Sequence, residues 1–159
     1  MPVLSKTCRM AASANDLWGA IFGATYVYPA AMPGLITDIR VTNRDGVTAG
    51  SVREITFGPA TGGMVSQATE QITRFDHATR TVESTFINDR NFVGRHFRDA
   101  SLVVKVDPYN ADNGPNSRGS TITWTLTYTW ISAMAPGNFS LEYFWNAIDQ
   151  GFRDLDLYI

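Results

Sequence analysis

The sequence predicts an α+β fold in which one curved antiparallel sheet wraps around a long C-terminal helix. Between residues 35 and 130, most of the chain consists of short segments that alternate apolar and polar residues and are separated by turn residues. The clearest segment, residues 121–130, keeps a period of two throughout, with threonine at every outward position. The C-terminal segment instead carries apolar side chains at steps of three and four, as an amphipathic helix does.

The composition is typical of one hydrophobic core and excludes several classes of protein. The chain has 159 residues, of which 44% are hydrophobic and 18% charged, so we expect one domain over residues 1–159 rather than disorder. The net charge is −2 and no basic cluster stands out, which argues against nucleic acid as a partner. A single cysteine excludes a disulfide framework. No signal peptide or membrane-spanning run is visible, so we expect a cytoplasmic protein that does not bind membranes.

The N-terminal part predicts one strand and two short helices. Residues 3–10 alternate as a strand. Ser13 or Asn15 can cap a helix that runs to about residue 25 and carries one apolar stripe. A second helical piece follows, and Pro29 and Pro33 should keep it short, because proline lacks the backbone N–H that a helix needs.

Five further strand-like segments precede residues 121–130, which gives a sheet of seven strands. They cover residues 35–44, 50–57, 64–75, 80–87 and 92–106, and the fourth pairs with the third across a turn at 76–79. In the last of the five, the alternation changes sides. Phe97 and Val103 fall on one face of the strand, and Leu102, Val104 and Val106 fall on the other. This change predicts a β-bulge.

The C-terminal helix predicts a hollow interior. Asn138 can cap this helix, with Glu142 in its first turn. Its apolar stripe consists of Leu141, Trp145, Ile148, Phe152, Leu155 and Ile159. A strongly twisted sheet and a single helix touch along only part of their length. We therefore expect a cavity lined by large apolar side chains, in which a ligand would bind.

One strand motif and three further residues carry a resemblance to a known family. Residues 50–58 read Gly-Ser-Val-Arg-Glu-Ile-Thr-Phe-Gly, Pro29 and Pro33 flank the second helix, and Tyr128 lies in the last strand. Together with the order of elements, these features resemble a divergent member of the Bet v 1 family of START-like helix-grip proteins, which includes the plant pathogenesis-related class 10 proteins. The resemblance implies a seven-stranded sheet, two short helices and a long helix around a hydrophobic cavity. It also implies a carrier of small hydrophobic or aromatic metabolites, such as a cytokinin, flavonoid or alkaloid, with a link to plant defence or hormone response.

Inward-facing aromatic and polar side chains are the candidate ligand contacts. Arg53 shares the face of Ile55 and Phe57, so it either anchors a ligand's carboxylate or hydroxyl group, or reaches solvent or pairs with Asp38. Tyrosine hydroxyls near the cavity either orient a ligand or bond to the backbone. The complete predicted set is Phe22, Tyr26, Tyr28, Arg53, Ile55, Phe57, Phe86, Trp124, Tyr128, Phe144 and Ile148.

No group of residues clearly predicts catalysis, and we assign no catalytic residue. Condensing enzymes of the resembled family combine a lysine, a glutamate and a tyrosine in the cavity, whereas the only lysines here are Lys6 and Lys105. The alternative to a carrier is a cyclase, isomerase or condensing enzyme that uses Tyr128, Arg53 or Glu70 as acid, base or clamp.

The remaining reactive residues favour structural roles. His77 lies in a turn and no histidine or carboxylate cluster has metal-ligand spacing, so we expect no metal and no cofactor. His96 with Asp89 or Asp99 forms either an acid–base pair or part of a solvated loop, and a hormone receptor that closes this loop is a third function class. Cys8 is expected to be a small buried strand residue. We expect a monomer or weak dimer with a small hydrophobic or aromatic ligand.

Overall fold

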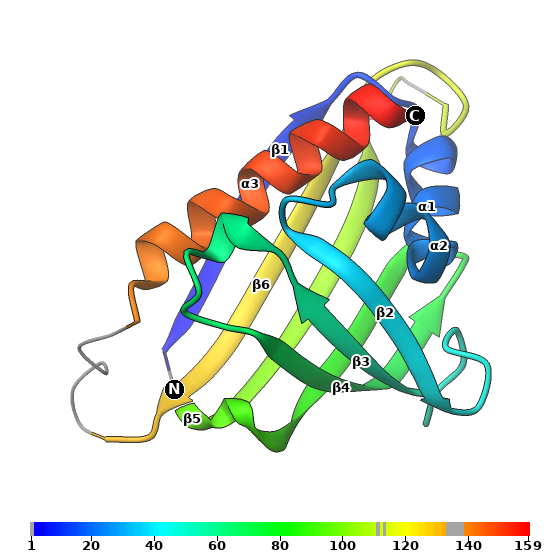
Figure 1. Cartoon of the computed structure of the whole chain (residues 1–159). Helices are drawn as coiled ribbons and strands as arrows, with labels where there is room; N and C mark the ends of the chain where they lie inside the picture. Colours follow the sequence, from blue (N-terminus) through cyan, green and yellow to red (C-terminus); the bar gives the residue numbers. More distant parts are fainter. Residues whose placement is uncertain (1, 111, 113, 133–138) are drawn as a thin grey trace.

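A computed structural model describes residues 2–110, 112, 114–132 and 139–159. The strands form one antiparallel sheet in the order β1-β6-β5-β4-β3-β2, and α3 runs along its curved inner side while α1 and α2 close one end (Figure 1). The elements are β1 (Val3–Met10), α1 (Ala14–Phe22), α2 (Ala24–Ala31), β2 (Ile36–Asn43), β3 (Val52–Phe57), a 3-10 turn η1 (Pro59–Thr61), β4 (Gln67–Asp76), β5 (Thr81–Pro108), β6 (Ser120–Trp130) and α3 (Leu141–Tyr158).

The 28-residue β5 consists of two arms that lie side by side. Its first arm pairs with β4 through residue 87, and its second arm pairs with β6 from residue 97 onward. The Val106 amide donates to the Arg80 carbonyl at 3.0 Å, so the chain has folded back on itself. Arg90 and Gly94 at the bend take φ angles of 64° and 92°, in the left-handed region that a tight reversal needs. With each arm counted as a strand, the sheet has the seven strands that the sequence predicts.

The predicted bulge lies in the second arm of β5. The register with β6 shifts between Phe97 and Asp99, so one extra residue is inserted at Arg98. This shift places Phe97 on the same buried face as Val104, even though their separation in sequence is odd. The bulge therefore resolves the conflict between the two faces, and the prediction is confirmed.

The helix ends follow side-chain caps. Ser13 caps α1, because its Oγ accepts from the Asp16 amide at 3.1 Å, and Asn15 lies inside the helix. Ser140 caps α3 in the same way through the Tyr143 amide, whereas the predicted cap, Asn138, lies outside the described residues. Pro29 does not end α2, which continues to Ala31.

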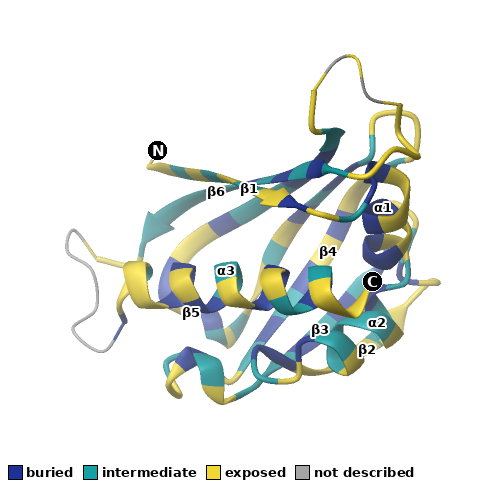
Figure 2. Ribbon diagram, turned by 90° about the horizontal axis from the view of Figure 1, so that it is seen from above, coloured by how far each residue is buried: buried dark blue, intermediate teal, exposed yellow. Residues whose placement is uncertain are grey.

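The core lies between the inner face of the sheet and α3. Ile122, Trp124 and Leu126 are buried on β6, and the ring centroid of Trp124 lies 3.7 Å from that of Trp145 on α3. This contact confirms that the alternating apolar face of residues 121–130 meets the apolar stripe of the helix. Figure 2 shows that buried and exposed positions alternate along α3, as expected for a helix with one face against the core.

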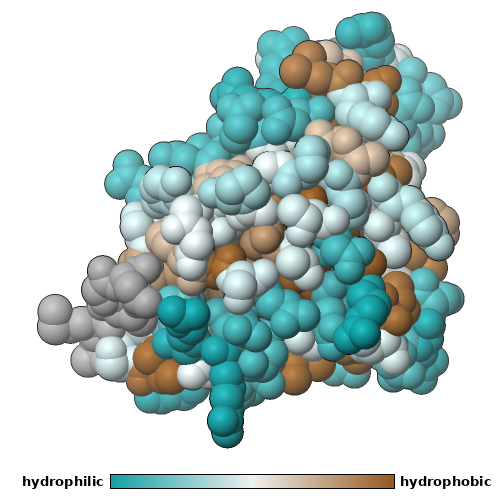
Figure 3. All heavy atoms as spheres, in the orientation of Figure 1, coloured by the Kyte–Doolittle hydropathy of each residue, from teal (hydrophilic) through white to brown (hydrophobic). Residues whose placement is uncertain are grey.

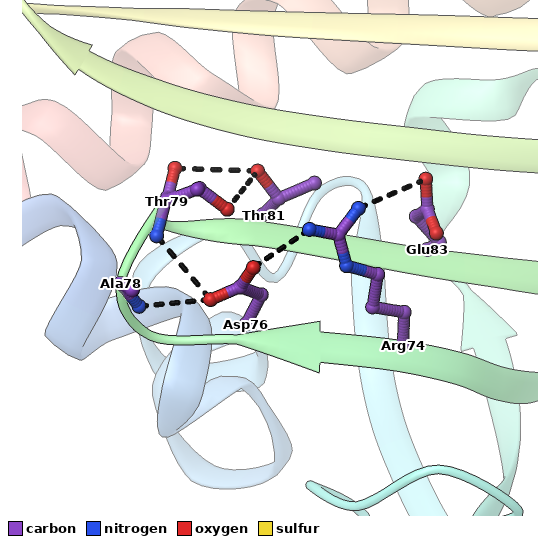
Figure 4. Close-up of polar contacts among 6 residues, drawn as sticks. All are labelled: Arg74, Asp76, Ala78, Thr79, Thr81 and Glu83. Carbon is purple, nitrogen blue, oxygen red and sulfur yellow. Dashed lines mark hydrogen bonds and ion pairs between the residues drawn. The ribbon is translucent and has the colours of Figure 1, made fainter.

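The turn between β4 and β5 is held by one carboxylate, as the close-up in Figure 4 shows. Asp76 accepts from the Ala78 amide at 2.9 Å and the Thr79 amide at 3.3 Å, and from Arg74 Nη2 at 2.7 Å. The hydrogen bond from Arg74 is the main cause that lowers the pKa of Asp76 to about 2. The turn predicted at 76–79 is therefore present.

On one face of the molecule, hydrophobic side chains do not merge into one large surface. On the face shown in Figure 3 they form several separate small patches among hydrophilic residues. Single exposed apolar residues are ordinary on proteins, so this face gives no sign of a large apolar docking area.

Candidate functional site

A cavity of about 130 Å³ lies beneath the sheet, between β2–β6, α2 and α3. Its walls are apolar except at four residues, which are Tyr28, Arg53, Glu70 and Ser84. The sequence predicts a hollow between the sheet and the C-terminal helix, and residues of both line this cavity.

Most of the residues predicted as ligand contacts do line this cavity. Five elements bring them together from distant parts of the sequence. β3 supplies three of them, α3 supplies two, and α2, β5 and β6 supply one each. The residues of the predicted set in the lining are Tyr28, Arg53, Ile55, Phe57, Phe86, Trp124, Phe144 and Ile148.

Three predicted contacts lie elsewhere, for two physical reasons. Tyr26 is 84% exposed, because residues two apart on a helix point in nearly opposite directions, and Tyr28 takes the inward position. Phe22 is 44% exposed and packs outside the cavity. Tyr128 has its ring centroid 5.6 Å from that of Phe97, in an aromatic cluster that fills the other end of the sheet. These three residues do not border the cavity.

Several lining residues were not predicted, and some had a visible signal. After the predicted bulge, Leu102 and Val104 fall on the inward side of the alternation. Continuing the alternation past the bulge would therefore have identified them. Ile36 and Ile39 lie three apart on β2, where a register shift breaks the alternation that the sequence argument used. Phe92 lies within the β5 bend, between Arg90 and Gly94, where strand alternation does not predict the direction of a side chain.

The polar part of the wall is centred on a buried ion pair. Arg53 on β3 lies directly opposite Glu70 on β4, and the two residues are only 7% and 3% exposed. Arg53 Nε donates to Glu70 Oε1 at 2.7 Å, and Nη2 donates to the same oxygen. The partner of Arg53 is thus Glu70, and neither Asp38 nor solvent takes that role. Because the two charges cancel, this end of the cavity carries no net positive charge.

The sequence itself indicates that Glu70 faces inward and needs a cation, although Glu70 is not among the predicted ligand contacts. It lies between Ala68 and Ile72 at steps of two, so strand alternation puts its carboxylate on the apolar inner face. A buried carboxylate needs a cation. The only inward cation on the strand next to it is Arg53.

The Tyr28 hydroxyl belongs to the same polar group. Part of the residue is exposed, but its hydroxyl is buried beside Arg53 and Glu70. Burial raises the pKa of Tyr28 well above its usual value, with Glu70 adding to the rise and Arg53 opposing it. The phenol therefore keeps its proton. Within the described residues its hydroxyl has no hydrogen-bond partner, so it can donate to a ligand.

The other reactive residues are away from the cavity. His96 is fully buried, its Nε2 lies 2.9 Å from the Met64 carbonyl, and burial lowers its pKa. It is therefore neither part of a solvated loop nor paired with Asp89 or Asp99. The Cys8 thiol donates to Asp149 at 2.8 Å, and burial together with that carboxylate raises its pKa to about 11. A thiol held in this way is a poor nucleophile.

His77 is also bound to its neighbours, outside the cavity. Its Nδ1 accepts from the Trp18 indole at 3.1 Å, and its ring packs against Phe22 and Phe75. Nowhere in the described ranges do three or more histidine, cysteine or acidic side chains gather as metal ligands would.

Comparison with known proteins identifies the fold. The sequence matches no family model and no curated protein. Ginseng major latex-like protein 151 from Panax ginseng superposes with a TM-score of 0.79 at 13% identity, over 99% of this chain and 96% of that one. A second crystal form gives 0.75 at 17% identity, over 98% and 97%. Ara h 8.0201 gives 0.70 at 18% identity, over 99% and 96%.

The chain therefore has the Bet v 1-like helix-grip fold, with a sequence that has diverged far from both of these proteins. This fold was expected from the resemblance of residues 50–58, and it is confirmed. No helix in the described part of the chain has the length and apolar character needed to cross a bilayer.

Proposed function

We propose that the protein binds a small, flat, largely apolar and uncharged molecule inside its cavity and acts as a carrier. The observation that carries this proposal is a cavity that combines a largely apolar wall with one compact polar group, formed by Tyr28, Arg53 and Glu70. Cavities of this kind orient a ligand through a few polar contacts while apolar surface supplies most of the affinity.

The cavity volume limits the ligand. An engineered cavity of about 150 Å³ in another protein binds benzene, so about 130 Å³ holds one ring as the side chains now stand. A cytokinin, flavonoid or alkaloid would require movement of the wall, and the volume favours the smallest of them. Burying roughly 200 Å² of ligand at about 25 cal/mol per Å² contributes ~5 kcal/mol before the entropy of association is subtracted. We expect affinities between millimolar and micromolar.

The ion pair determines which polar group suits the site. Arg53 uses two of its five N–H donors on Glu70, so donors remain, and the Tyr28 hydroxyl adds another. The carboxylate of Glu70 can accept. A neutral ligand with an acceptor and a donor side by side, such as a carboxamide, meets these groups. A carboxylate ligand would bring a second negative charge next to Glu70.

Calorimetric titration with three matched single-ring probes tests the proposal. Benzamide should bind at least tenfold tighter than benzoate, which corresponds to ~1.4 kcal/mol, and ethylbenzene should fall between them. Val104→Phe, which fills the cavity, should abolish all three, whereas Val3→Phe on the exposed end of β1 should change none. Unchanged binding to Val104→Phe would place the site elsewhere and end this proposal.

The finer form of the proposal is a cytoplasmic carrier of plant-type metabolites with a part in defence or hormone response. Its support is the structural likeness to a ginseng major latex-like protein and to Ara h 8.0201. A thermal-shift screen of plant hormones and aromatic metabolites is the direct test, and only ligands that raise the Tm of the native protein but not of Val104→Phe count in its favour.

A second function, proton-transfer catalysis, is favoured by one observation. The second carboxylate oxygen of Glu70 has no partner among the described residues, and the Tyr28 hydroxyl lies in the same group. A base beside a neutral donor is the arrangement that removes a proton next to a carbonyl. Nuclear magnetic resonance of acetophenone in D₂O would report such exchange. A rate that does not fall in Tyr28→Phe would exclude this function.

A further inference from the structure

One edge of the β1 backbone has no partner strand among the described residues. Within that part of the chain β1 pairs only with β6, so its other side is an edge of the sheet. The Tyr128 amide donates to the Pro2 carbonyl at 3.1 Å, which makes that position a hydrogen-bonded pair. Antiparallel pairs alternate, so Leu4, Lys6 and Cys8 also direct their N–H and C=O groups toward β6.

The residues between them therefore direct their backbone groups outward. Two side-chain contacts support this assignment, because side chains approach most closely in the pairs that lack backbone hydrogen bonds. Ser5 Oγ lies 2.9 Å from Thr125 Oγ1, and Thr7 Oγ1 lies 2.8 Å from Thr123 Oγ1. The outward N–H and C=O groups of Ser5, Thr7 and Arg9 have no hydrogen-bond partner in the described part of the chain.

A groove of about 680 Å³, partly open to solvent, runs along this edge. One wall is residues 6–10 of β1, and the other is the side of α3 that carries Asp149, Arg153 and Asp156. Successive strand residues point to opposite faces, so a groove bordered by all of residues 6–10 reaches the backbone edge itself. Only Phe152 borders both this groove and the internal cavity, so the two are separate sites.

The charges along the groove favour an acidic occupant. β1 carries Lys6 and Arg9 and no acidic residue, and α3 adds Arg153. The lining therefore has three cations against two carboxylates, and both carboxylates are engaged within the chain. Asp149 accepts from Cys8 and Arg153 and lies 3.9 Å from Lys6 Nζ, and Asp156 accepts from the amides of residues 11 and 12 at 2.9 and 3.0 Å. Arg9 is exposed and lies 3.6 Å from the Tyr109 ring centroid, with no carboxylate partner among the described residues. A second copy of this chain would instead bring two pairs of β1 cations together.

We infer that the β1 edge and α3 form a second binding site, which takes an extended acidic segment of a partner protein as an added antiparallel strand. Residues of that segment opposite Ser5, Thr7 and Arg9 would each exchange two backbone hydrogen bonds with β1. Acidic side chains of the segment would meet Lys6 on one face of the strand and Arg9 on the other. The sheet grows by one strand, and the internal cavity is not involved.

Two short end-blocked peptides, one alternating glutamate with valine and one alternating lysine with valine, test the inference by amide exchange. In the free protein the amides of Ser5, Thr7 and Arg9 should exchange freely while those of Lys6 and Cys8 are protected. The glutamate peptide should slow exchange at the three outward amides at least tenfold, and the lysine peptide should not. Equal effects of the two peptides, or no effect of either, would overturn the inference, as would protection that arises from dimers seen by sedimentation.

A matched pair of variants separates backbone pairing from side-chain contact. Thr7→Pro and Thr7→Val both lose the hydroxyl contact with Thr123, but only Thr7→Pro loses the outward N–H, a change that an edge strand tolerates. Affinity for the glutamate peptide should fall at least tenfold in Thr7→Pro and persist in Thr7→Val. Arg9→Glu, which leaves the backbone intact, should reverse the preference between the two peptides. Retained binding in Thr7→Pro with unchanged Tm, or retained preference in Arg9→Glu, would contradict the inference.

Discussion

The two ends of the inner face of the sheet are packed differently. At the end near α3's start, Phe97, Trp130 and Phe139 pack together, with Phe97 and Trp130 stacked at a centroid distance of 4.8 Å. At the other end, Arg53 and Glu70 occupy the wall and a cavity remains. Rings can interlock with rings, whereas a buried ion pair needs polar neighbours, and apolar packing against it would leave its remaining hydrogen-bonding groups unsatisfied. The polar pair therefore coincides with the open volume.

The largest expected effect tests the filled end. Phe97→Ala should lower the free energy of unfolding by ~3–5 kcal/mol, because Phe97 is fully buried among four aromatic rings and the space cannot collapse. Urea unfolding measures the change. Phe22→Ala, at a ring that is 44% exposed, is the matched control and should cost much less. Equal losses would show that the filled end is not better packed than the surface.

Breaking the ion pair should destabilise the protein strongly, whereas replacing both of its residues by apolar ones should not. Glu70→Gln leaves the Arg53 charge buried and should cost about 3 kcal/mol in the free energy of unfolding. The double variant Arg53→Met with Glu70→Leu removes both charges and should lie within about 1 kcal/mol of the native protein. Benzamide affinity should nevertheless fall tenfold in the double variant. If the double variant is as unstable as the single one, the pair is not an isolated electrostatic unit.

A close contact on α3 should couple stability to cavity volume. A Cβ at Gly151 would lie 2.6 Å from Leu35 Cδ2 and 3.3 Å from Met32 Sδ, and both of these side chains line the cavity. Gly151→Ala should gain ~1 kcal/mol of helix propensity but push these side chains inward, so stability changes little while benzamide affinity falls several-fold. Gly19→Ala, where nothing lies within 4 Å, should simply stabilise the protein. An unchanged affinity in Gly151→Ala would show that the packing of α3 does not affect ligand binding in the cavity.

The smallest effect concerns the β4–β5 turn. The folded pKa of Asp76, about 2, lies below its ordinary value of 3.8, so the ionised form stabilises the turn. That stabilisation is complete above about pH 4 and is lost as the pH falls through the folded pKa. Amide exchange at Ala78 and Thr79 should therefore accelerate, beyond its intrinsic pH dependence, between pH 4 and 2. In Asp76→Asn this extra acceleration should be absent.

Periodicity predicted the fold well, because the alternation within a segment is enough to identify it as a strand. The same argument placed Arg53 and Ile55 inward correctly. It could not find the Arg53–Glu70 pair, since that requires the register between two strands, nor could it choose between Tyr26 and Tyr28 without knowing where α2 begins. Tyr128 was misplaced for a different reason. Alternation gives the face of a strand but not the position along the cavity, and Tyr128 lies past its end.

The pairing of β1 with β6 has a consequence for how the chain reaches its folded state. Ser5 and Thr125 are 120 positions apart, so the contact between them closes a loop that spans most of the chain. During synthesis β1 leaves the ribosome long before β6, the strand that it pairs with in the described sheet. Long-range pairings of this kind slow folding and leave strand edges exposed meanwhile. The first strand to be made is thus among the last to join the sheet, and the lysine and arginine that it carries would protect it from premature association during that wait.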